Sequence, residues 1–133
     1  MKNDEFSEIT GKIIKAFYRV YNTLGYGFLE KVYENAMVIA LRKMGIACIS
    51  QAGLKVYYEN EIVGSYAADL LVEEYIVVEL KAAESICEAH ECVLVNYLRA
   101  SDQEVGLLLN FGKKPQFKRK VFSAEFKKRM KPY

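Results

Sequence analysis

Three ionisable residues lie inside the most hydrophobic part of this chain, at a spacing that suits catalysis. The stretch YAADLLVEEYIVVELKA, residues 66–82, carries Asp69, Glu79 and Lys81 between runs of Leu, Val and Ile. Ionised side chains in such surroundings are costly unless they are paired or bind a metal. Neighbouring carboxylates repel each other unless a cation lies between them, and oxygen ligands of this kind suit Mg²⁺ or Mn²⁺. A lysine beside the metal could position or deprotonate a water, so the residue types predict hydrolysis of phosphodiesters.

Whether the two carboxylates meet depends on the loop between two predicted strands. Glu79 and Lys81 are two residues apart and share a face of their strand, whereas Leu80 points to the other face. A two-residue turn at Glu73-Glu74 would leave Asp69 on the wrong face for Glu79. A three-residue loop, or a β-bulge, would bring the two carboxylates together at roughly 5 Å between Cβ atoms. The alternative is a salt bridge between Asp69 and Lys81 with a solvated Glu79.

Hydrophobic periodicity predicts the elements that position these residues. Steps of three and four residues predict a helix over about residues 9–24 and a second over 29–44, in which Leu29, Val32 and Tyr33 turn inward. The later elements are strands over 54–58, 62–72 and 75–81, a helix over 88–100, and strands over 105–110 and 117–122; residues 46–50 are a candidate short strand that is not counted in the order. This order, α-α-β-β-β-α-β-β, predicts an α/β or α+β fold with a mixed sheet flanked by helices.

Length and composition limit the class of protein. The chain has 133 residues, of which 52% are hydrophobic and 13% aromatic, and this predicts one folded domain over residues 1–133. No apolar run reaches the roughly 18 residues that a membrane-spanning helix needs. The amino terminus has no signal-peptide apolar core, so a cytoplasmic location is expected.

The net charge of +2 is distributed unevenly along the chain. The first 112 residues carry −6, and the remainder carries +8. A basic end beside an acidic body is typical of a nucleic-acid-binding protein. The predicted nucleic-acid contacts are Lys113, Lys114, Lys118, Arg119 and Lys120, and a basic tail follows from about residue 123. The alternative is a solvated surface strand with a frayed tail.

Four motifs that follow one another in the chain resemble those of a known family. GFLEKVY (27–33) matches the pattern GxxExxY, and ADLLV with VVELKA matches D…ExK; NYL (96–98) and VGLLLNFG (105–112) come later. Over about residues 8–123 the chain resembles the GxxExxY family, small bacterial and archaeal proteins grouped with the PD-(D/E)XK nuclease superfamily. The resemblance implies a restriction-endonuclease-like fold and a nuclease that acts on DNA or RNA with Mg²⁺ or Mn²⁺.

The resemblance also implies roles for individual residues. Asp69, Glu79 and the backbone carbonyl of Leu80 would hold the metal, and Lys81 would be the catalytic lysine. Glu30, an acidic residue of an early helix, would reach the metal site directly or through water.

Two further motif positions are expected to be structural. Tyr33 lies one turn beyond Glu30, and a packed ring with a hydrogen-bonded hydroxyl is the favoured interpretation. Gly27 is expected to permit the turn before the helix rather than to touch a ligand.

The chain departs from the family at two positions near the site. Tyr97 matches the tyrosine of the third helix, but Val93 stands four residues earlier, where related nucleases commonly have Gln. Ala67 stands two residues before Asp69, at a position that is often basic. These departures favour an alternative function, a catalytically inactive nuclease-fold protein that binds nucleic acid or assembles with proteins. A nuclease this small is also expected to gain specificity from a homodimer or a partner protein.

Overall fold

A computed structural model describes residues 2–123, with side chains from residue 7 onward. Its helices are α1 (Lys2–Leu24), α2 (Glu30–Lys43) and α3 (Glu88–Ala100). Its strands are β1 (Cys48–Tyr58), β2 (Glu61–Val72), β3 (Ile76–Lys81), β4 (Val105–Phe111) and β5 (Pro115–Val121). The predicted order α-α-β-β-β-α-β-β is therefore confirmed, while the basic tail from about residue 123 lies outside the described residues.

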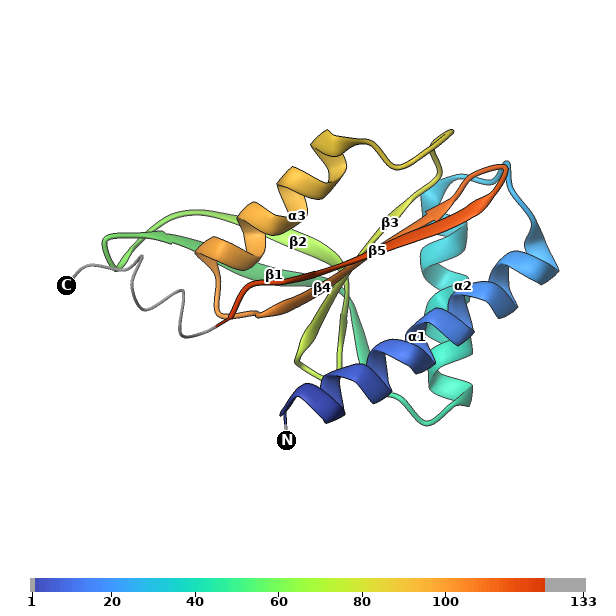
Figure 1. The fold of residues 1–133 in the computed structure, drawn as a ribbon, viewed down its shortest axis with the longest axis horizontal. Coiled ribbons are helices and arrows are strands. Elements are labelled where there is room, and N and C mark those ends of the chain that lie inside the picture. The colour runs from blue at the N-terminus through green and yellow to red at the C-terminus, as the bar shows by residue number, and fades with distance from the viewer. Residues whose placement is uncertain (1, 124–133) are drawn as a thin grey trace.

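The five strands form one mixed sheet between two helical layers. Their order across the sheet is β1-β2-β3-β4-β5, and every neighbouring pair is antiparallel except the central pair β3 and β4, which is parallel. Helix α3 makes the crossover between these two parallel strands and covers one face, whereas α1 and α2 cover the other (Figure 1). Within residues 2–123, none of the helices is both long enough and apolar enough to cross a membrane.

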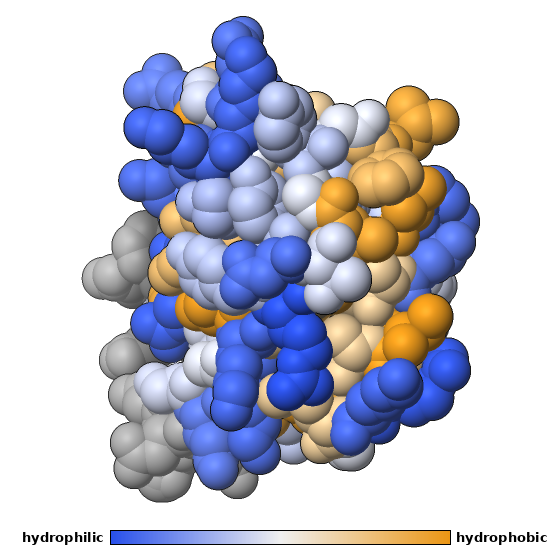
Figure 2. All heavy atoms as spheres, turned by 90° about the vertical axis from the view of Figure 1, so that its right-hand side faces the viewer, coloured by the Kyte–Doolittle hydropathy of each residue, from blue (hydrophilic) through white to orange (hydrophobic). Residues whose placement is uncertain are grey.

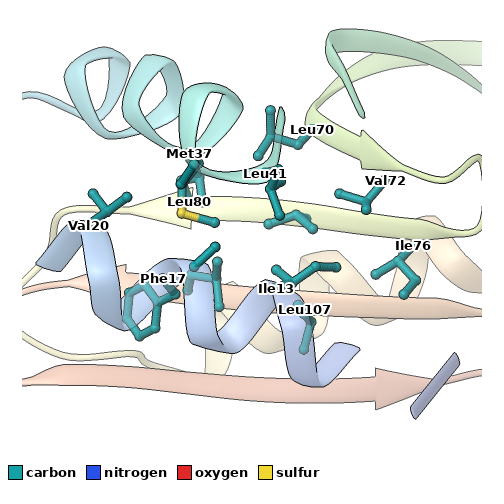
Figure 3. Packing of buried hydrophobic residues seen from close by; sticks show 14 of the residues in the cluster. Ile13, Phe17, Val20, Met37, Leu41, Leu70, Val72, Ile76, Leu80 and Leu107 are labelled. Atoms are coloured by element: carbon teal, nitrogen blue, oxygen red, sulfur yellow. The ribbon is translucent and has the colours of Figure 1, made fainter. Parts of the chain in front are cut away.

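The larger core lies between the sheet and helices α1 and α2. Figure 3 shows the apolar side chains of these helices pointing toward those of β2, β3 and β4. The residues labelled there are Ile13, Phe17, Val20, Met37, Leu41, Leu70, Val72, Ile76, Leu80 and Leu107. A smaller core under α3 contains Leu54, Ala68, Val77, Leu94, Leu98 and Leu108. Strands β3 and β4 are thus covered on both faces, which explains their nearly continuous apolar sequences.

The first strand differs from the prediction of two separate strands. β1 runs without interruption from Cys48 to Tyr58 and passes through Gln51 at a φ of 53°. Such a left-handed backbone is uncommon for a residue other than glycine, and it puts an irregularity into the strand instead of ending it.

The inward face of α2 also differs from the prediction. Leu29 and Val32 are 80% and 39% exposed, whereas Tyr33, Met37 and Leu41 are fully buried. Apolar residues occupy more than one stripe of this helix. Periodicity alone therefore predicted the burial of Tyr33 correctly and that of Leu29 and Val32 wrongly.

Candidate active site

The loop between β2 and β3 decides whether Asp69 and Glu79 meet. Val72 pairs with Ile76, so the loop has three residues, Glu73–Tyr75, rather than two. The same register continued by three residues places Asp69 opposite Glu79. The odd loop that co-location requires is therefore present.

Reciprocal hydrogen bonds fix the two carboxylates where the strands part. The backbone N–H of Asp69 donates to Glu79 Oε2 at 3.2 Å, and the N–H of Leu80 donates to Asp69 Oδ2 at 2.8 Å. Each acid is thus anchored by one oxygen to the neighbouring strand. Its second oxygen, Asp69 Oδ1 or Glu79 Oε1, takes no part in this pair of bonds.

The alternation of side chains along β2 changes at Asp69. Leu70 belongs to the core under α1 and α2, but Ala68, two residues earlier, belongs to the core under α3. Gln51 lies across from Asp69 on β1 and has the left-handed backbone described above. The irregularity therefore coincides with the acidic residue, as irregular strand positions often do at functional sites.

The surroundings of Glu79 favour its protonated form. Burial and the neighbouring charge of Asp69 raise the pKa of Glu79 to about 7, although the hydrogen bond from the Asp69 amide and the charge of Lys81 oppose the rise. The charge of Glu30 makes a smaller contribution in the upward direction. A carboxylate in this position therefore lacks a sufficient counter-charge from the protein itself.

Lys81 follows at the end of β3, on the face that Glu79 occupies. It is half-buried and pairs with Asn110 of the parallel strand β4. The side chain of Asn110 is fully buried and accepts from the N–H of Ala83 at 2.9 Å while donating to the Ala83 carbonyl at 3.0 Å. This clamp fixes the chain just beyond Lys81. The sequence interpretation missed Asn110, whose only signal was an amide inside an otherwise apolar strand.

Helix α2 contributes a second acid besides the predicted Glu30, whose role stays a prediction. Glu30 is exposed, whereas Glu34, one turn later, is only 4% exposed. Glu34 accepts from Ser50 Oγ at 2.9 Å and from Gln51 Nε2 at 2.9 Å, and Gln51 Nε2 also lies 3.5 Å from Asp69 Oδ1. Helix α2 is therefore linked to Asp69 by hydrogen bonds that pass from Glu34 through the Gln51 side chain. An acid on the stripe of buried apolar residues was the available sequence signal for it.

Two stacked tyrosines lie beside the carboxylates on the α3 side. The rings of Tyr66 and Tyr97 are 3.4 Å apart between centroids and inclined by 16°. Burial, followed by the charge of Glu79, raises the pKa of Tyr66. Its hydroxyl is buried and has no hydrogen-bond partner among the residues that the structure describes. Tyr97 was singled out from the sequence, and Tyr66 was missed.

The GxxExxY residues build the turn before α2. Gly27 has a φ of 108°, which only glycine adopts readily. The Tyr33 hydroxyl donates to the carbonyl of Gly25 at 2.7 Å and accepts from the N–H of Phe28 at 3.2 Å. The Tyr33 ring stacks on Phe111 at 4.1 Å. Tyr33 is therefore a packed ring with a bonded hydroxyl, and it holds the turn closed.

The predicted basic residues do not form one surface. Lys118 and Lys120 lie opposite Leu108 and Gly106 of β4 and face α3, where Lys120 pairs with Glu91 at 2.6 Å. Arg119 alternates to the other face. Lys113 and Lys114 are exposed in the β4–β5 turn, at the end of the sheet that also carries Lys81. The basic charge is thus split between two faces and a turn.

The arrangement of strands and charges defines a restriction-endonuclease-like fold with a D…ExK pair where two strands separate. The sequence profile of the PD-(D/E)XK nuclease superfamily matches residues 7–120, and the chain belongs to this superfamily. The finer assignment to the GxxExxY family stays a prediction. No curated protein matches this chain.

One solved structure is similar in fold. The structure described as "Crystal structure of SSO0001" superposes with a TM-score of 0.50 at 16% identity and covers 75% of this chain. The match spans 54% of that other chain, so this protein corresponds to about half of it.

Proposed function

We propose that this protein is a divalent-metal-dependent nuclease that hydrolyses phosphodiester bonds of DNA or RNA. The observation that carries the proposal is the opposed pair Asp69 and Glu79, anchored by reciprocal backbone hydrogen bonds, with Lys81 on the same face of β3. Membership of a nuclease superfamily supports the same reaction class.

The donor atoms fit a hard divalent cation such as Mg²⁺ or Mn²⁺. The raised pKa of Glu79 indicates a charge deficit that a cation beside Asp69 would relieve. Asp69 Oδ1, Glu79 Oε1 and the Leu80 carbonyl are the oxygens proposed to bind it. No three His, Cys, Asp or Glu side chains converge on a single metal position in residues 7–123, so water and substrate oxygens would complete the shell.

Each protein group has a proposed part in the reaction. A bound cation would supply Lewis-acid polarisation of the phosphate and stabilise charge that develops on it. Lys81 would orient the attacking water and offset that charge. Glu34, through Gln51, would hold Asp69 in place, and Glu30 would act on the site through water. The exposed Lys113 and Lys114 would contact the phosphate backbone beside the site.

Cleavage assays test this proposal directly. Single- and double-stranded DNA and RNA are incubated with native protein and Mg²⁺ or Mn²⁺, and with the variant Lys81→Met. The matched control is Lys55→Met, because Lys55 is exposed on β1 away from the site. Cleavage by native protein and by the control, and its loss in Lys81→Met, would support the proposal; equal residual cleavage in all three would indicate a contaminating nuclease.

Metal binding is tested separately by thermal unfolding. Mg²⁺ or Mn²⁺ should raise the melting temperature of native protein, and Asp69→Asn should remove this gain. A native protein whose melting temperature does not respond to either cation would contradict a metal-dependent site.

A second candidate function is nucleic-acid binding without cleavage. Val93 is 46% exposed and Ala67 is also exposed. Because both side chains are apolar, neither position offers a polar group to the site. Binding that persists in EDTA, together with no cleavage in either cation, would favour this function.

A further inference from the structure

Three connections meet in a cavity at the end of the sheet where the candidate active site lies. They are the α1–α2 turn, the segment after β3 and the β4–β5 turn, which Figure 1 shows at the same end of the molecule. The cavity has a volume of about 580 Å³, within the range of small-ligand sites. Tyr26, Phe28 and Leu29 of the α1–α2 turn line one side of the cavity. Ala83 and Glu84, which follow β3, and Lys113 of the β4–β5 turn line the rest.

The walls of this cavity are held in place by hydrogen bonds between and within the three segments. Tyr33 closes the α1–α2 turn, and Asn110 clamps Ala83, as described above. In addition, the Tyr21 hydroxyl lies 2.8 Å from the Gly112 carbonyl and 2.7 Å from that of Lys113. A Cβ at Gly112 would lie 2.3 Å from the Ala83 carbonyl, so two walls are packed directly against each other. The cavity is therefore preformed, which lowers the entropic cost of binding a ligand.

The lining combines exposed apolar groups with a few charges. Tyr26, Phe28 and Leu29 are 56%, 46% and 80% exposed, although large apolar side chains are normally covered. Figure 2 looks onto this end of the molecule and shows hydrophobic side chains gathered on it. Flat aromatic faces beside a lysine suit a planar ring attached to an anion, and Glu84 can accept from ring amino groups.

The cavity lies next to the candidate active site along the chain. Glu30, the predicted acid of α2, lines it. Ala82, the residue after Lys81, also lines it. A group seated in the cavity would therefore lie beside a phosphate held at Lys81.

We propose that the cavity binds an unpaired nucleobase of the nucleotide next to the scissile phosphate. The inference rests on the proposed nuclease function and narrows its substrate to single-stranded nucleic acid or an unpaired strand end. A base inside a duplex cannot enter the cavity without being unstacked and unpaired, which costs free energy, whereas a single-stranded base stacks on aromatic rings without that cost. Lys113 contacts the adjoining phosphate.

Binding of labelled oligonucleotides tests the cavity independently of cleavage. Fluorescence anisotropy in EDTA compares a 12-nucleotide single strand with a blunt hairpin duplex that contains the same sequence. The variants are Tyr26→Ala and the double variant Tyr26→Ala/Phe28→Ala. The controls are Tyr26→Phe, which keeps the ring, and Ile62→Ala, which removes an equally exposed apolar side chain from β2, away from the cavity.

The expected result is a loss specific to the single strand. Native protein should bind the single strand more tightly than the duplex, and the double variant should lose about tenfold or more in affinity for the single strand alone. Tyr26→Phe and Ile62→Ala should bind as native protein does. Melting temperatures of the variants establish that they are folded; if the double variant unfolds, Tyr26→Ala alone gives the decisive comparison.

Other outcomes would overturn the inference, and they distinguish its failure from failure of the proposed nuclease function. Equal affinity of native protein for both oligonucleotides, or unchanged affinity in a folded Tyr26→Ala variant, would refute base binding in the cavity. A change from dimer to monomer in sedimentation with unaltered oligonucleotide affinity would assign the patch to a second copy of the chain. If single-strand binding depends on Tyr26 but native protein cleaves nothing, base binding in the cavity stands, whereas the nuclease proposal and the position of the base beside a scissile phosphate both fail.

Discussion

Replacing Glu79 with glutamine should stabilise the metal-free protein at alkaline pH. Burial and the Asp69 charge raise the pKa of Glu79 from 4.5 in the unfolded chain to about 7 in the folded protein. The folded protein therefore binds this proton more tightly than the unfolded chain does. Stability from this group is fully present below pH 4.5 and is lost as the pH rises to about 7, and the loss is about 3 kcal/mol. A glutamine side chain in place of Glu79 would carry no charge and could still accept from the Asp69 amide.

The measurement is urea unfolding of native protein and Glu79→Gln in EDTA, between pH 4 and pH 8.5. The two proteins should be nearly equal in stability at pH 4, and the variant should be more stable by up to about 3 kcal/mol at pH 8. For a domain of this size, that difference corresponds to about 10 °C in melting temperature. Glu61→Gln, an exposed position on the same hairpin, is the control and should change stability by less than about 0.5 kcal/mol at every pH.

Two results would refute this reasoning. A difference between native protein and Glu79→Gln that stays constant with pH would show that Glu79 has an ordinary pKa. A variant that is less stable than native protein at pH 8 in EDTA would show that the protein already compensates the charge. Added Mg²⁺ or Mn²⁺ should narrow the gap at pH 8, because a cation relieves the repulsion only in native protein.

Three other substitutions test the supports of the site. Glu34→Ala should cost about 1–2 kcal/mol in urea unfolding because it removes the buried acceptor that Ser50 and Gln51 of β1 share, and Glu34→Gln should cost less; equal losses would contradict the hydrogen-bond argument. Gly112→Ala should destabilise by about 1–3 kcal/mol because its Cβ would meet the Ala83 carbonyl, whereas Gly53→Ala, which has open space, is the control and should be far milder. Tyr66→Phe should leave stability unchanged or slightly higher, since the buried hydroxyl has no partner among the described residues; a loss above about 1 kcal/mol would reveal a partner for that hydroxyl.

The order of elements could be predicted from the sequence, but the loop that assembles the site could not. Alternation and helical spacing are local properties of the sequence, and helical spacing predicted both end residues of α3 correctly. The loop length depends on Glu73 and Glu74, which adopt φ values of 53° and 63°. Glutamate disfavours this conformation, so only the pairing of β2 with β3 imposes it. The sequence could therefore state the condition for co-location without deciding it.

The supporting residues required contacts that sequence spacing does not contain. Glu34 is identified by donors on β1 that lie 16 and 17 residues away in the chain. Asn110 is identified by a clamp on Ala83, which lies 27 residues earlier. A motif match favoured Glu30 instead, because the pattern records residue type and spacing and not burial. The residues that the hairpin contributes to the site were thus predictable, whereas the length of its loop and the residues contributed by other elements were not.

The reciprocal anchoring of Asp69 and Glu79 has a consequence for comparing this protein with its relatives. Each acid satisfies a backbone amide at the point where β2 and β3 separate, so replacing either one with a residue that has no side-chain oxygen would leave an amide without its acceptor. Selection for folding alone would therefore preserve a side-chain oxygen at both positions after catalysis had been lost, in either an acid or its amide. The side chain of Lys81 makes no hydrogen bond or ion pair within the described part of the chain, so no hydrogen bond of this kind retains it. Divergence at the lysine, or replacement of an acid by its amide, is the change that would mark relatives that have stopped cleaving.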